Sequence, residues 1–181
     1  MTEKEKYDKM HLIPGYSPGP GIAHVQDALK WIRDDSVIDF GCGTGDAANA
    51  FRELGNEIYC VDISRNGLRH DFGDRFFESP LHILPAKLPK VKWGFCCDVM
   101  EHLPEEWVND SLLAMSRKVE NCYFTISGVP DTWGKKVGEI LHLTVKPFVW
   151  WEKKLKEYWD RVKLISDDGS SYKVVAMGRK C

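Results

Sequence analysis

Short apolar runs alternate with helical stretches through the middle of the chain. Residues 37–40 (VIDF) and residues 57–61 are largely apolar, and residues 46–54 between them have the composition of a helix. Strand, helix, strand is the order of a βαβ unit, whose two strands lie parallel in one sheet. The pattern therefore predicts an α/β domain that begins near residue 36.

The same alternation continues after this unit. Residues 81–84 and 93–97 are expected strands. After Pro104, apolar residues recur at i, i+4, i+7 and i+11, starting from Val108. This spacing places them on one face of a helix. Residues 122–126 follow as the best β-forming run of the second half, which favours a central parallel strand.

The last third of the chain has a helix and a hairpin in its pattern. Large apolar residues are spaced at helical intervals through residues 148–159, and two apolar runs at 162–165 and 172–177 flank Asp168-Gly169. A short polar turn between two such runs is typical of a β-hairpin. We expect an alternating α/β domain with an antiparallel pair at its end.

Composition narrows the class of protein. The 181 residues are 43% hydrophobic with a formal net charge of −2, which suits one domain core and provides no broad basic field for nucleic acid or anionic membrane. No apolar run is long enough to span a bilayer. We expect one soluble, cytoplasmic domain, and buried reduced thiols rather than disulfides at Cys42, Cys60, Cys96, Cys97, Cys122 and Cys181.

The strongest local motif is VIDFGCGTGD (37–46), in which a strand runs into alternate glycines and then into a helix. Glycines allow a sharp turn and the close approach of a ligand to bare backbone. A pyrophosphate at this helix would meet the like charge of Asp46, whereas S-adenosylmethionine (SAM) carries a sulfonium and an ammonium. The motif favours SAM over a dinucleotide, and the alternative is a tight turn without a ligand.

An acid follows the next strand of the predicted sheet. Asp62 ends EIYCVD, where α/β nucleotide sites place a carboxylate that accepts hydrogen bonds from ribose hydroxyls. Its distance from the glycine loop fits one βαβ unit. The alternative is that Asp62 only caps a helix.

A third segment extends the pattern. WGFCCDVMEHLP (93–104) is an apolar strand, an acidic turn and the start of a helix. With the glycine loop and Asp62, over residues 36–127, it resembles the class I SAM-dependent methyltransferases. CCDVMEHLP and the later LHLTVKPFVWW also resemble small methyltransferase-like proteins of phages and bacteria.

The resemblance implies a Rossmann-like three-layer sandwich with a seven-stranded, mainly parallel sheet and an antiparallel C-terminal hairpin strand. One domain of residues 1–181 would then contain an N-terminal lid or helix (1–35), a cofactor-binding core (36–127), an acceptor-side segment (128–160) and the hairpin (161–181).

The resemblance also implies a place for SAM. Asp39 or the loop backbone would hold its methionine part, with Asp98 and Val99 beside it, and Asp62 would hold the ribose. The implied cofactor-binding residues are Asp39, Gly41, Cys42, Gly43, Gly45, Asp62, Ile63, Leu81, Asp98 and Val99.

The adenine contacts are open. The family often has an acid after the third strand, and this chain has FFESPLHIL there. Glu78 or Ser79 would accept from the adenine amino group, or Leu81 and His82 would simply enclose the ring beside Ile63.

Two histidines are candidate catalytic residues. Methyl transfer needs mainly a close, aligned acceptor, and a histidine base helps where the acceptor must lose a proton. His102 follows the fourth strand, and His142 lies in the acceptor-side segment. The alternatives are a structural hydrogen bond for His102 and a packing role for His142. Asp98, Glu101 and His102 are close in sequence, but without a second set of ligands we predict no metal.

The predicted function is methyl transfer from SAM to a small-molecule acceptor, with S-adenosylhomocysteine as product. Tyr16 and Trp133, in turn-rich loops, are candidate lid residues, while the helical spacing of Trp151 places it in the core.

A nucleic-acid acceptor is disfavoured because residues 96–102 lack the Pro-Pro-aromatic set that grips a flipped base. The alternatives are a protein or other macromolecular acceptor, and a SAM- or nucleotide-binding protein without turnover. A nicotinamide-dependent oxidoreductase is disfavoured by Asp46.

Overall fold

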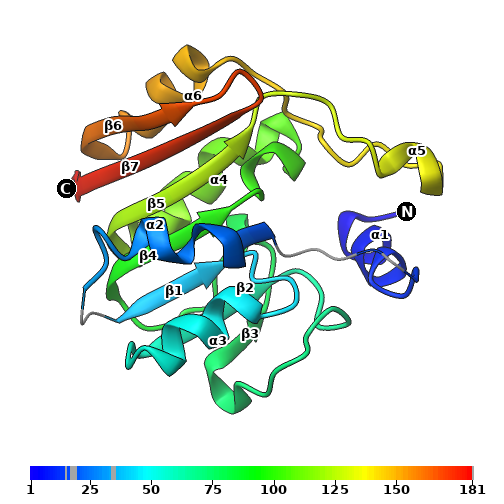
Figure 1. Ribbon diagram of the computed structural model, residues 1–181, viewed down its shortest axis with the longest axis horizontal. Coiled ribbons are helices and arrows are strands. Elements are labelled where there is room, and N and C mark those ends of the chain that lie inside the picture. Colours follow the sequence, from blue (N-terminus) through cyan, green and yellow to red (C-terminus); the bar gives the residue numbers. More distant parts are fainter. Residues whose placement is uncertain (15, 17–19, 34–35, 181) are drawn as a thin grey trace.

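The computed structural model describes residues 1–14, 16, 20–33 and 36–180, and in these residues seven strands form one sheet (Figure 1). The strand order is β3-β2-β1-β4-β5-β7-β6; the first five strands pair in parallel, whereas β7 pairs antiparallel with both β5 and β6. The mainly parallel seven-stranded sheet with an antiparallel C-terminal hairpin is thereby confirmed. The strands are β1 (Val37–Phe40), β2 (Ile58–Asp62), β3 (Phe76–Glu78), β4 (Val91–Cys97), β5 (Val119–Ser127), β6 (Trp159–Asp167) and β7 (Ser171–Arg179).

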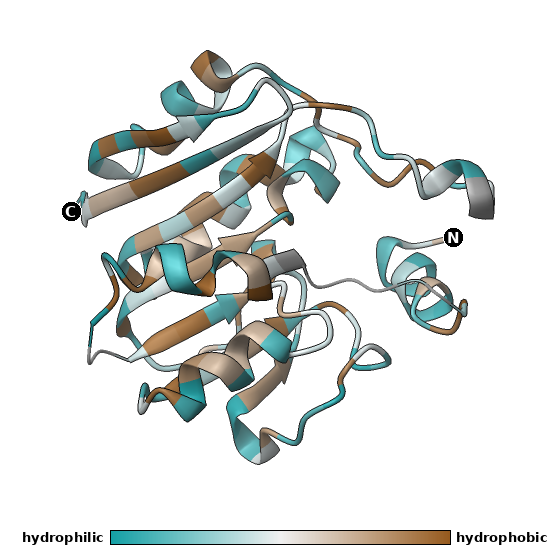
Figure 2. Cartoon of the chain, in the orientation of Figure 1, coloured by the Kyte–Doolittle hydropathy of each residue, from teal (hydrophilic) through white to brown (hydrophobic). Residues whose placement is uncertain are grey.

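Helices cover both faces of the sheet and make three layers. Apolar side chains of α4 and α6 pack in a cluster on one face, and those of α2 and α3 pack in a cluster on the other. Because β1 is covered on both faces, all of its residues are buried, and its sequence is nearly continuously apolar. Figure 2 shows hydrophobic residues gathered along the strands. The α-helices are α1 (Glu3–Met10), α2 (Val25–Ala28), α3 (Asp46–Glu53), α4 (Glu105–Ser116), α5 (Gly134–Val137) and α6 (Phe148–Leu155).

Four short 3-10 helices complete the described elements, and one of them corrects a predicted strand. The apolar run at 81–84 predicts a strand, but Leu81–Ile83 form the 3-10 helix η3. Pro80 and Pro85 flank this run and cannot donate to a sheet ladder. The third strand is instead β3, whose register pairs Phe77 with Val61. The other three are η1 (Pro20–His24), η2 (Gly73–Arg75) and η4 (Met100–His102).

The boundaries of the last elements also differ from the expected ones. The helix predicted over 148–159 ends at Leu155, and Trp159 already begins β6. Trp159 is fully buried in the same cluster as Trp151, so the apolar spacing there reflects a shared core rather than one helix.

The charged start of the chain forms α1 at the carboxyl side of the sheet. A capping box begins this helix: the Thr2 hydroxyl accepts from the backbone of Glu5, and the Glu5 carboxylate accepts from the backbone of Thr2. The Lys6 ammonium donates to the carbonyl of Ile140, 3.4 Å away, which ties α1 to the segment after α5 (Figure 1). Much of the predicted loop at 14–21 lies outside the described residues.

The thiol prediction is confirmed for the described cysteines, since Cys42, Cys60, Cys96, Cys97 and Cys122 are buried and free. Cys181 lies outside the described residues. Within the described part of the chain, the helices are too short or too polar to cross a membrane.

Candidate functional site

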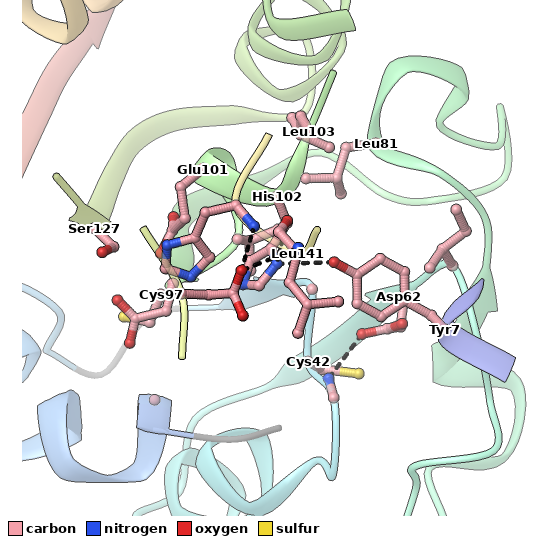
Figure 3. Close-up of a pocket in the computed structure, with 18 of the residues that line it drawn as sticks. Tyr7, Cys42, Asp62, Leu81, Cys97, Glu101, His102, Leu103, Ser127 and Leu141 are labelled. Atoms are coloured by element: carbon pink, nitrogen blue, oxygen red, sulfur yellow. Dashed lines mark hydrogen bonds between the residues drawn. The ribbon is translucent and has the colours of Figure 1, made fainter. Parts of the chain in front are cut away.

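A cavity of about 790 Å³ opens at the carboxyl ends of the parallel strands, where α/β sheets bind ligands. Loops after β1, β2 and β4 line it, because parallel neighbours end at the same edge. The structure brings both candidate histidines to this cavity together with all but one of the predicted cofactor-binding residues (Figure 3). The predicted residues that line it are Asp39, Gly41, Cys42, Gly43, Asp62, Ile63, Leu81, Asp98, Val99, His102 and His142.

The glycine loop turns sharply after β1, as its sequence predicts. The backbone N–H of Gly41 donates to the carbonyl of Val61 over 2.7 Å. Gly41 has a φ of 75°, and a Cβ there would lie 2.4 Å from the Val99 side chain. Gly45 is the predicted residue outside the lining: a Cβ on it would meet Phe72 at 2.7 Å, so this glycine serves the packing of α3.

Asp62 is held at the end of β2 by backbone donors. Its Oδ2 accepts from the N–H of Gly43 over 2.8 Å, and its Oδ1 accepts from the N–H of Ser64 over 3.0 Å. Burial raises the pKa of this carboxyl. Each oxygen keeps a lone pair, so the oriented carboxylate can accept further hydrogen bonds from ligand hydroxyls.

Asp39 is a buried acid without a full set of partners. It is 3% exposed, and its Oδ2 has no hydrogen-bond partner among the described residues. Burial first, and then the charge of Asp62, raises the pKa of Asp39 to about 8. Since buried polar atoms are normally paired, the free oxygen at the cavity indicates a place for a donor or cation from a ligand.

The lining is strongly acidic. Among the described residues that line the cavity, seven carry carboxylates and none is Lys or Arg. Asp46 does not belong to this set, because it pairs with His70 over 2.8 Å and with Arg69 over 3.3 Å. A cationic ligand is therefore favoured over a phosphate. The seven are Glu3, Asp39, Asp62, Asp98, Glu101, Asp131 and Asp168.

The structure brings His102 and His142 together, with ring centroids 4.7 Å apart. His102 Nδ1 lies 3.1 Å from the carbonyl oxygen of Leu141 and 2.8 Å from the Tyr7 hydroxyl. His142 Nδ1 lies 2.7 Å from the carbonyl oxygen of Val129. Because a carbonyl only accepts, the tautomer that satisfies these carbonyl contacts carries the proton on Nδ1 and keeps the Nε2 lone pair.

Burial and the neighbouring His142 lower the pKa of His102 to about 3. The ring is therefore neutral at physiological pH and only weakly basic. Such an imidazole is a weak general base.

Aromatic side chains from α1 and from the loops beside α1 and α5 line one part of the cavity. Tyr16 and Trp133, the two candidate lid residues, contact each other edge to face with centroids 5.8 Å apart, and both line the cavity. Trp151 is fully buried in the core, as its spacing predicts. No role is predicted from the sequence for Tyr7 on α1 or for His11 at its C-cap, although the capping box of Thr2 and Glu5 is a readable sign of that helix.

The structure reduces the number of residues that are candidates for contact with adenine. Glu78 forms ion pairs with Lys4 and Arg65, both at 2.8 Å, and is absent from the described lining. Ser79 lines the cavity, but its hydroxyl donates to the carbonyl of Ile83 over 2.5 Å. His82 instead packs against Trp107, with the ring planes tilted by 38°. Leu81 remains an apolar wall of the cavity.

The sheet order, the antiparallel hairpin and the cavity at the carboxyl edge define a Rossmann-like α/β protein with a site for a small ligand. Residues 38–119, from β1 to the start of β5, match a family model described as a methyltransferase domain. The strand order of the sheet and the family match both indicate the Rossmann-like methyltransferase fold. No curated protein sequence matches the chain.

Solved structures share this fold along most of the chain. The PH0226 protein from Pyrococcus horikoshii OT3 is 13% identical with a TM-score of 0.70, over 96% of this chain and 98% of that one. Magnesium protoporphyrin IX methyltransferase from Synechocystis PCC 6803, with bound SAM, is 16% identical with a TM-score of 0.68, over 100% and 98%. The small RNA methyltransferase HEN1 is 16% identical with a TM-score of 0.65, over 86% of this chain and 25% of that one.

Proposed function

We propose that this chain is a SAM-dependent methyltransferase that acts on a small-molecule acceptor and releases S-adenosylhomocysteine. The observation that carries the proposal is the acidic cavity at the carboxyl edge of a methyltransferase-type sheet, with no Lys or Arg in its described lining. SAM is cationic at its sulfonium and ammonium, whereas a dinucleotide would bring phosphates into this field. SAM bound to a methyltransferase of the same fold supports the assignment.

The residues present fit SAM. The unpartnered Oδ2 of Asp39 suits the ammonium, with the backbone of Gly41 and Gly43 beside it. Asp62, oriented by Gly43 and Ser64, suits the ribose hydroxyls. When bound, SAM supplies an activated methyl group.

The remaining proposed contacts concern the adenine ring and the methionine side. Ile63 and Leu81 line the cavity beyond Asp62 and would enclose the ring, while Asp98 and Val99 border the opposite side at the end of β4. Asp98 is the one non-glycine residue with a positive φ in the described chain, at 53°, and its carboxylate accepts from the Thr125 hydroxyl over 3.0 Å. This strained turn directs an acid to the cavity.

A small acceptor is favoured by the cover over the site. Tyr7, Tyr16 and Trp133 line the cavity from segments that lie outside the sheet. The acidic lining opposes a polyphosphate backbone, so a nucleic-acid acceptor is disfavoured. His102 and His142 lie on this side and are proposed to act at the acceptor. A macromolecular acceptor and binding without turnover stay the alternatives; the cytoplasmic location and the narrower phage and bacterial resemblance stay predictions.

Parallel calorimetric titrations with SAM, S-adenosylhomocysteine and NADH test the proposal. We expect binding of the first two and none of NADH. Asp62→Ala should weaken SAM binding by about 1–3 kcal/mol, because the hydrogen bonds to the ribose are lost. Asp74→Ala, which removes an exposed acid of η2, is the control and should leave the affinity unchanged. Binding of NADH alone, or equal SAM affinity of wild type and Asp62→Ala, would refute this assignment.

A further inference from the structure

Glu101 is a buried acid that SAM binding leaves unexplained. Its side chain is fully buried in η4, directly after the strained turn at Asp98. Burial first, and then the charge of Asp98, raises the pKa of this carboxyl, and neither of its oxygens has a hydrogen-bond partner within the described residues. Buried carboxylates are normally paired or bound to a metal. Glu101 lines the cavity and so faces a space that a ligand can enter.

Two imidazoles complete the surroundings of this carboxylate. Glu101, His102 and His142 each offer a ligand atom, and these atoms all lie within 4.8 Å of one another. Figure 3 shows Glu101 and His102 beside each other at the cavity. Ligand atoms held about 2.1 Å from one ion lie about 3–4 Å apart, so small side-chain rotations suffice to bring the three to a common metal.

The hydrogen bonds behind both histidines have the arrangement found around metal ligands. Each Nδ1–H points to a backbone carbonyl, that of Leu141 for His102 and that of Val129 for His142. A histidine that binds a metal commonly donates its other ring N–H to a carbonyl or carboxylate, which fixes the tautomer and aims the free nitrogen. Tyr7 provides a further contact to His102 Nδ1 at 2.8 Å.

We propose that Glu101, His102 and His142 bind one divalent transition-metal ion at the acceptor side of the cavity. Two imidazole nitrogens and one carboxylate suit Mn²⁺, Fe²⁺, Co²⁺ or Zn²⁺ better than Mg²⁺, which prefers oxygen ligands alone. Asp98, directly after β4, lines the same cavity and places a further carboxylate there. The three side chains leave coordination positions open toward the cavity.

The role of the ion rests on the proposed function, but its binding does not. An acceptor hydroxyl on an open coordination position would have its pKa lowered and would release its proton to solvent, which leaves the oxygen ready to attack. The expectation of no metal rests on the absence of a second ligand set near residues 98–102 in sequence. In the folded chain His142, which lies in the segment after α5, supplies the further ligand.

Titration of the purified full chain with Co²⁺ tests the proposal, followed by calorimetry and by visible absorption, which reports the ligands of the ion. We expect one Co²⁺ per chain, and at least about 10-fold weaker binding in each of Glu101→Gln and His142→Asn, since losing even a hydrogen-bond partner of a metal ligand has an effect of this size. His82→Asn is the control, because His82 packs against Trp107 outside the cluster, and it should bind Co²⁺ as wild type does.

Failure of wild type to bind Co²⁺, Mn²⁺ or Zn²⁺ would overturn the proposal, as would undiminished Co²⁺ binding in both cluster variants whose far-UV circular dichroism is native. SAM affinity measured on the same samples keeps the two proposals apart. Wild type that binds Co²⁺ but not SAM would overturn the proposed function and leave the metal site standing.

Discussion

Replacing Asp39 by asparagine should change how the stability of the protein depends on pH. The carboxyl of Asp39 is buried, and its pKa is raised to about 8 from an ordinary value of 3.8. Because the folded-state pKa is the higher one, the folded protein holds this proton more tightly than the unfolded chain does. The contribution to stability is therefore full below pH 3.8 and is lost as the pH rises toward 8.

The size of the effect follows from the same linkage. Between the two pKa values, each pH unit lowers the free energy of unfolding by about 1.36 kcal/mol through this one group. From about pH 5 to about pH 7 wild type should therefore lose about 2.7 kcal/mol on account of Asp39. The asparagine side chain has nearly the same shape and no proton to lose, so Asp39→Asn should not show this loss.

Urea unfolding at about pH 5 and about pH 7 without cofactor measures the difference. Titrating groups away from Asp39 contribute equally to wild type and variant, so the comparison reports Asp39 together with its coupling to the neighbouring Asp62. Asp110→Asn, at an exposed acid of α4, is the control and should follow wild type. Equal losses in wild type and Asp39→Asn would refute the reasoning, because they would show that Asp39 is ionised in the folded protein throughout this range.

Two further substitutions test the packing around the site. Gly41→Ala should be clearly less stable than Gly55→Ala in thermal unfolding: both residues have a positive φ, but a Cβ at Gly41 would lie 2.4 Å from Val99, whereas a Cβ at Gly55 meets nothing within 4 Å. Equal melting temperatures would show that the loop can move away from Val99. Trp151→Ala should lower the free energy of unfolding by about 3–5 kcal/mol in urea, since Trp151 is fully buried, and Trp150→Ala, at a half-buried residue, should lower it by less. An equal loss in both would contradict the core position of Trp151.

Much of the sheet could be predicted because parallel strands covered on both faces are short apolar runs. This is why β1 is predicted with its observed bounds, and why the predictions for β4 and β5 are wrong at their ends only. Residues 81–84 are as apolar as a strand, and their flanking prolines are the sign that they are not one. The charged α1 has little apolar pattern, so its capping box is the main sequence evidence for it.

The part of the cavity lined by the loops after β1 and β2 could be predicted better than the part around His102 and His142. Asp39, Gly41 and Asp62 lie within one βαβ unit, where sequence spacing fixes spatial neighbours. The contacts of His102 with Tyr7 and with His142 join segments far apart in the chain, and only the folded structure brings them together. The cluster of Glu101, His102 and His142 likewise joins segments far apart in the chain, so the sequence did not reveal it.

A crystal structure of the full chain with S-adenosylhomocysteine is the most direct test of the central claim, that the acidic cavity binds SAM. We predict that the ribose hydroxyls lie within hydrogen-bond distance of the Asp62 carboxylate and that the ligand ammonium lies toward Asp39. A ligand bound outside the cavity, or one whose ribose lies away from Asp62, would contradict the account.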